Sequence, residues 1–161
     1  MGTNKVRTSE SESHLPKASK STSKIDSQTA AYMAANAAEA KKGHGTLVLD
    51  VAKVTVLTDY FVIAGGETLT QVRAIADAIH EALAKEGLHP RSIEGKKEGR
   101  WVLMDYELII VHVLHERERN FYKLEQFWNH ALIVDQSEWL EEEEPEAPTP
   151  DLKARRQTRK P

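Results

Sequence analysis

The spacing of apolar positions predicts three helices along the chain. Residues 27–42 are rich in alanine, which has the highest helix propensity, and Gly43 follows them as a C-terminal stop. The second helix begins near Thr68, which has the spacing of a capping box with Gln71. Its apolar residues recur at intervals of three and four, as on one face of an amphipathic helix: Leu69, Val72, Ala76, Ile79 and Leu83. The third helix is expected from Glu116, with an apolar stripe formed by Phe121, Leu124, Trp128 and Ala131.

Short runs of β-branched and aromatic residues between these helices predict five strands. They lie at residues 47–51, 60–64, 91–94, 101–105 and 108–114. The last run is apolar at nearly every position, which is typical of a central strand covered on both faces. The order α-β-β-α-β-β-β-α therefore predicts an α/β fold, α+β-like in character, with a mixed five-stranded sheet flanked by helices.

The same pattern divides the chain into one domain and two tails. Residues 28–135 contain the predicted elements and are long enough for one modest core. Residues 1–27 are rich in Ser and Thr and poor in large apolar residues, so we expect them to be disordered. Residues 136–161 contain an acidic run, closely spaced prolines and a final basic cluster, and we expect a second disordered tail there.

Charge narrows the classes of function. The net charge is −3 at pH 7, yet residues 43–135 alone carry −4, from 10 basic and 14 acidic residues. Domains that bind nucleic acid through phosphates usually have a clustered basic surface, so we expect little direct RNA contact from this domain. The absence of cysteine excludes disulfides and thiolate zinc sites. The longest dense apolar run, residues 108–114, is too short to span a bilayer, so no membrane contact is expected.

Two groups of residues offer weak candidate chemistry. The pair Gly65-Gly66, between a strand and a helix, could present backbone N–H groups to an anion, but a tight turn explains the two glycines better. His112, His115 and Glu116 are close in sequence, but residues 112 and 115 point to opposite faces if the strand continues. We therefore interpret His112 as a hydrogen-bonded core histidine and His115 as part of a loop that opens a helix.

Asp105 and Glu107 form the strongest catalytic candidate. Carboxylates two positions apart share a face and can hold Mg²⁺, and with the Gly65-Gly66 turn they outline a nucleotidyl-transfer or metal-dependent phosphate enzyme. Against this, the two residues lie where two strands must turn, and Asp is favoured in turns. We predict no catalytic residue, no metal site and no cofactor, and keep this enzyme as the alternative function.

Several spaced segments resemble the Iojap-related ribosomal silencing factor family. They are DYFVIA at 59–64, QVRAIAD at 71–77, GRWVLMDY at 99–106, VHV at 111–113 and RNFYKLE at 119–125, followed by Trp128. The resemblance as a whole covers about residues 28–132, nearly the whole predicted domain. Two turns, at residues 65–67 and 107–108, depart from the usual family pattern.

The resemblance implies a nucleotidyltransferase-like fold that has lost its catalytic carboxylates. It also implies that the chain binds the large ribosomal subunit through the ribosomal protein of the L-fourteen family. Occupation of that surface would block association with the small subunit and repress translation under nutrient limitation. The expected location is the cytoplasm, with a plastid or mitochondrion as the alternative, and the sequence leaves open whether the free protein forms a homodimer.

Trp101 and Tyr122 are the leading candidates for contact with this partner. Tyr122 lies off the apolar stripe of its helix, and Trp101 begins a strand after a polar loop. Trp and Tyr are enriched at interface hot spots, and by resemblance both positions correspond to the family's aromatic contacts. Leu103 shares the face of Trp101, and Met104 and Asp105 are further candidates. The competing interpretation is that both aromatic residues belong to the core.

Overall fold

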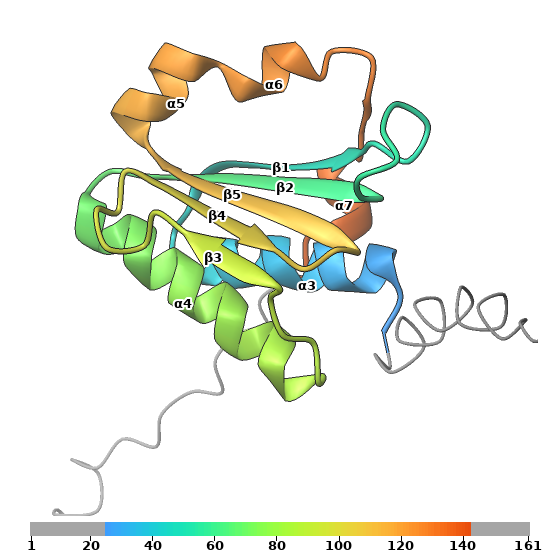
Figure 1. Cartoon of the computed structure of the whole chain (residues 1–161), viewed down its shortest axis with the longest axis horizontal. Coiled ribbons are helices and arrows are strands. Elements are labelled where there is room, and N and C mark those ends of the chain that lie inside the picture. The colour runs from blue at the N-terminus through green and yellow to red at the C-terminus, as the bar shows by residue number, and fades with distance from the viewer. Residues whose placement is uncertain (1–24, 143–161) are drawn as a thin grey trace, which may run out of the picture.

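The computed structural model describes residues 25–142, which form one sheet with helices on both sides (Figure 1). The strands are β1 His44–Asp50, β2 Tyr60–Gly66, β3 Ser92–Glu94, β4 Trp101–Asp105, β5 Ile109–His115 and β6 Leu132–Ile133. The helices are α3 Ser27–Ala40, α4 Leu69–Lys85, α5 Glu116–Tyr122, α6 Leu124–Phe127 and α7 Gln136–Trp139. Residues 1–24 and 143–161, which belong to the two predicted tails, lie outside the described residues.

The sheet is mixed, as predicted, and its strand order is β3-β4-β5-β2-β1-β6. Strands β2 and β5 pair in parallel at the centre, whereas the other neighbours pair antiparallel. The nearly continuous apolar sequence of β5 fits this central place, because residues on both of its faces are covered. The predicted count of five strands is wrong, since β6 adds a sixth beside β1. A two-residue strand has no period-two pattern that the sequence could reveal.

Helices α3 and α4 cover one face of the sheet (Figure 1). The buried residues of α3 are all alanines, and their small side chains let this helix lie close to β1, β2 and α4. The cap of α4 follows the prediction, because the Thr68 hydroxyl accepts a hydrogen bond from the Gln71 N–H at 3.0 Å. Gln71 Oε1 in turn accepts from the Glu67 N–H at 2.7 Å, one residue earlier than in an ideal capping box.

The opposite face of the sheet lies below α5 and α6 (Figure 1). A second apolar cluster there contains Phe61, Ile63 and Leu114, and Leu124, Trp128 and Ala131 pack against it, as the predicted stripe requires. Phe121 does not belong to the core, however, because its side chain is 78 % exposed. The predicted single helix is broken at Lys123, whose φ of 48° and ψ of 53° end α5 and change the direction of the stripe.

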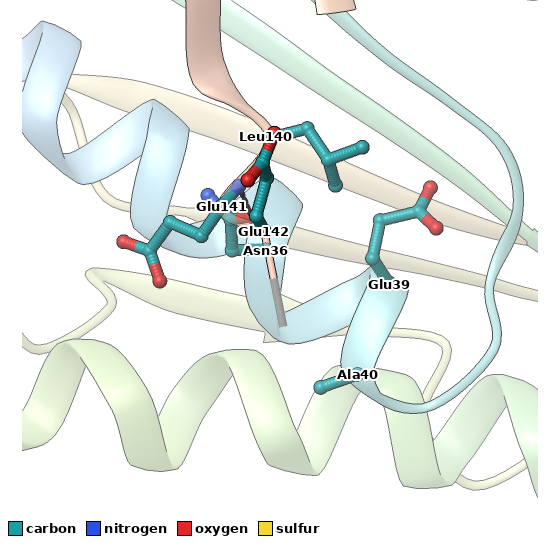
Figure 2. Close-up of a pocket in the computed structure, with 6 residues that line it drawn as sticks. All are labelled: Asn36, Glu39, Ala40, Leu140, Glu141 and Glu142. Atoms are coloured by element: carbon teal, nitrogen blue, oxygen red, sulfur yellow. Dashed lines mark hydrogen bonds between the residues drawn. The ribbon is translucent and has the colours of Figure 1, made fainter. Parts of the chain in front are cut away.

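The folded region extends beyond residue 135, the predicted boundary with the second tail. Helix α7 follows, and its Trp139 is buried in the core formed with α3. Asn36 holds this segment, because its Nδ2 donates to the Trp139 carbonyl at 2.6 Å and its Oδ1 accepts from the Glu141 N–H at 2.9 Å. Figure 2 shows the segment over α3, where Leu140, Glu141 and Glu142 border a hollow of about 430 Å³ with Asn36, Glu39 and Ala40. A four-residue helix is too short for its periodicity to be recognised beside the acidic run.

Candidate protein-binding surface

Strand β4 divides the predicted contact residues between the two faces of the sheet. Trp101, Leu103 and Asp105 point to the face of α5 and α6 and are each partly exposed. Met104 points the other way, into the core beneath α3 and α4, and is 1 % exposed. The prediction that Met104 contacts a partner is therefore wrong, because alternation along a strand turns it away from Trp101.

A buried histidine holds the indole of Trp101 in place. Trp101 Nε1 donates a hydrogen bond to His112 Nδ1 at 3.1 Å, and the two ring centroids lie 5.9 Å apart. Burial lowers the pKa of His112 to about 4, so at neutral pH the imidazole is uncharged and its Nδ1 can accept this bond. The prediction of a hydrogen-bonded core histidine is confirmed.

Trp101 and Tyr122 meet although they come from different elements. Their ring centroids lie 5.0 Å apart, with 52° between the ring planes. Phe121 continues the row, because its ring meets that of Tyr122 edge to face at 5.0 Å. We call Trp101, Tyr122 and Phe121 the aromatic ridge. The core interpretation fails for Tyr122, which is 46 % exposed, whereas Trp101 is half-buried against the second apolar cluster.

A shallow hollow adjoins each end of the aromatic ridge. The first, of about 370 Å³, is lined by Glu94, Gly95, Trp101 and Leu103. The second, of about 340 Å³, is lined by Phe121, Tyr122, Lys123, Gln126 and Phe127. Phe127 is 77 % exposed and was not among the residues predicted from the sequence. The spacing gave no signal for it, because residue 127 is three after Leu124 and four before Ala131 and would lie beside their stripe in an unbroken helix.

Asp105 lies at the end of strand β4, and both of its carboxylate oxygens bind groups of the same chain. Its Oδ2 lies 2.8 Å from Arg91 Nη2, and its Oδ1 accepts from the Glu107 N–H at 2.8 Å. The ion pair raises the pKa of Arg91. Asp105 therefore closes the turn between β4 and β5, as expected of an Asp at this place.

The groups of the alternative enzyme do not converge. Gly66 is opposite His115 in the sheet, whereas Asp105 is opposite Ile110, five residues earlier on β5. At about 3.3 Å per residue, the glycine turn and the carboxylate are roughly 17 Å apart along the strand. The predicted combination of Asp105, Glu107 and the Gly65-Gly66 turn is therefore wrong as a single site. Among residues 25–142, no group of three His, Asp or Glu side chains is placed to hold a metal ion.

The fold and this surface define an α/β domain with a mixed sheet, on which a row of aromatic side chains lies between two shallow hollows. Within the described part of the chain, no helix is long and apolar enough to cross a membrane.

Comparison with known proteins identifies the family. The family described as "Ribosomal silencing factor during starvation" matches residues 24–161. The ribosomal silencing factor RsfS of Bacillus subtilis is 38 % identical over 103 residues, which cover 64 % of this chain and 87 % of that protein. The chloroplastic protein Iojap of Zea mays is 28 % identical over 101 residues, covering 63 % of this chain and 44 % of that protein.

A solved structure agrees with these matches. The crystal structure of a Chromobacterium violaceum protein superimposes with a TM-score of 0.64 at 31 % identity, covering 65 % of this chain and 88 % of that one. The chain belongs to the ribosomal silencing factor family, as its sequence segments suggested.

Proposed function

We propose that this chain binds the large ribosomal subunit through the ribosomal protein of the L-fourteen family and thereby blocks association with the small subunit. The observation that carries the proposal is the contact between Trp101 and Tyr122, which presents two aromatic rings side by side on a partly exposed face. Aromatic side chains of this kind dominate the binding energy of many protein interfaces. Family membership supports a ribosomal target.

The proposed mechanism is steric and involves no chemical step. The ribosomal protein contacts the aromatic ridge and places side chains in the hollows at its two ends. Leu103 contributes apolar area in the first hollow, and Asp105 lies two residues further along the same face of β4. While the surface is occupied, the small subunit cannot approach, so translation is repressed under nutrient limitation. Relatives from a bacterium and from a chloroplast are consistent with action in a bacterial cytoplasm or, alternatively, an organelle.

Direct binding to the ribosomal protein tests the surface. We expect Tyr122→Ala to weaken this binding by about 2 kcal/mol, because it removes an exposed hot-spot side chain without opening the core. Trp101→Ala should cost at least as much, although it also leaves His112 without its donor, so the thermal unfolding of this variant must be compared with wild type. Leu57→Ala is the control, because Leu57 is an exposed apolar residue of the β1–β2 loop. Wild-type affinity in both folded aromatic variants would contradict the surface assignment.

Sedimentation with purified subunits tests the function itself. The protein should migrate with the large subunit in a sucrose gradient and reduce the amount of joined ribosomes when small subunits are added. Tyr122→Ala should restore joining in proportion to its lost affinity. Unchanged joining at saturating protein, despite binding to the large subunit, would contradict the steric mechanism.

A further inference from the structure

Helix α5 carries Tyr122 yet has no buried residue of its own. Helices of this length are usually held by an apolar face packed on the core. At its start, His115 caps the helix and its ring also contacts the Glu67 carbonyl oxygen at 3.0 Å. The end of α5, where Tyr122 lies, therefore needs another attachment to the sheet.

Arg119 provides this attachment. Its side chain is only 15 % exposed, and burial lowers its pKa. Nη1 donates to the His44 carbonyl oxygen at 2.8 Å, which ties α5 to the first residue of β1. Nε lies 3.8 Å from Glu125 Oε1, which ties α5 to α6 across the break at Lys123. A single guanidinium thus links three elements, as its five donors in a planar fork allow.

Two glycines make room for this guanidinium. A Cβ at Gly45 would lie 3.1 Å from Arg119 Nη1, and the φ of +54° at Gly45 is itself unfavourable for other residues. A Cβ at Gly65 would lie 3.4 Å from the same atom and 3.2 Å from the His44 carbonyl oxygen. His44 and Gly65 are opposite each other in β1 and β2, so the two strands form a slot that fits the guanidinium.

We propose that Arg119 is a positioning residue that sets Tyr122 against Trp101 and so builds the partner-binding surface. Tyr122 follows Arg119 by one helical turn, and the Lys123 N–H closes that turn on the Arg119 carbonyl at 3.0 Å. With the guanidinium seated in its slot, the last turn of α5 holds the phenol ring beside the indole. Arg119 itself makes no contact with the partner. The effect of Arg119 on partner affinity rests on the proposed function, whereas its effect on the contact between the Trp101 and Tyr122 rings does not.

A double-mutant cycle on ribosomal-protein affinity tests the inference. We expect Arg119→Ala to lower affinity about tenfold in wild type and to have little further effect in a Tyr122→Ala background, because it acts through Tyr122. Arg117→Ala is the matched control, since Arg117 is an exposed arginine of the same helix, and it should leave affinity unchanged. An equal loss from Arg119→Ala in both backgrounds, or no loss in either, would overturn the proposal.

A structural readout separates positioning from general stability. Nuclear Overhauser effects between the Trp101 indole and the Tyr122 ring should weaken in Arg119→Ala, while those between Phe61 and Trp128 remain. If Arg119→Ala does not fold, Arg119→Lys replaces it, because it keeps the charge and the stem but lacks the fork. Unchanged ring contacts in the folded variant would overturn the inference. If Tyr122→Ala alone leaves affinity unchanged, the proposed docking fails, and the ring contacts still decide the role of Arg119.

Discussion

At the scale of single residues, His112 connects the core of the domain to the proposed surface. Its ring meets Phe61 edge to face at 5.4 Å on one side and accepts the Trp101 N–H on the other. Protonation would place a charge among apolar side chains and would also occupy the nitrogen that accepts this bond. Burial is the cause of the shift, and it lowers the pKa of His112 to about 4.

Stability should therefore depend on pH through His112. Its pKa in the folded state, about 4, lies below the unfolded value of 6.5, so the unfolded chain binds the proton more readily between these values. The contribution is complete above pH 6.5 and is lost as pH falls toward 4, by about 3 kcal/mol in total. Urea unfolding of wild type and His112→Asn across this range measures it, because Asn keeps an acceptor and does not titrate. Parallel pH profiles for the two proteins would contradict the prediction.

Several residue-scale features followed from the sequence, and the exceptions have physical reasons. Alternation along β4 correctly placed Leu103 on the face of Trp101. The same rule places Met104 on the opposite face, which is buried. Phe121 was assigned to the core because the stripe assumed an unbroken helix. The helix is broken at Lys123, which has a positive φ. Lysine is not a residue type that predicts this conformation, so the sequence contained no sign of the break.

At the scale of elements, the junction of α5 and α6 stores a small amount of strain at Lys123. Its left-handed backbone is unfavourable for a residue with a Cβ by about 1 to 2 kcal/mol. We therefore expect Lys123→Gly to leave the free energy of unfolding unchanged or slightly higher, and Lys123→Val to lower it, because a β-branched residue fits this conformation poorly. Chemical denaturation of the two variants measures the difference. A more stable Val variant would mean that α5 and α6 can join into one helix.

Helix α7 is the second element with a testable role. Trp139 fills part of the core beside α3, and Asn36 holds the backbone on either side of Leu140. A chain that ends after residue 135 should therefore be less stable than one that ends after residue 142, by roughly the 3 to 5 kcal/mol of a buried Trp. Thermal unfolding of the two truncated proteins makes the comparison. Equal stability would restore the domain boundary at residue 135.

The elements that the sequence predicted correctly share one property, which is that each has a periodic pattern of its own. The long stripe of α4 and the apolar run of β5 are of this kind. Strand β6 forms only because the edge of β1 is available beside Leu132 and Ile133, and α7 only because α3 leaves room for Trp139. Such short elements depend on tertiary contacts, which no local pattern contains.

The whole molecule has an uneven distribution of charge that bears on its partner. Residues 43–135 carry −4, and Glu94 lines the hollow beside Trp101. Ribosomal RNA would repel such a surface, whereas a basic ribosomal protein would attract it. In the proposed complex, charge would direct the encounter and the orientation, while the aromatic ridge would supply most of the contact energy.

Ionic strength separates these two contributions. Raising the salt from low to physiological concentration should slow association with the ribosomal protein, because the Debye length falls toward about 8 Å, and should change dissociation little.

Glu94→Gln should reduce the association rate at low salt, since Glu94 lines the hollow beside Trp101. Glu81→Gln removes the same charge from α4, on the other layer of the molecule, and should have a smaller effect. Stopped-flow or surface-based kinetics would measure both rates. An association rate that is insensitive to salt, or that rises with it, would mean that the surface does not meet a basic partner.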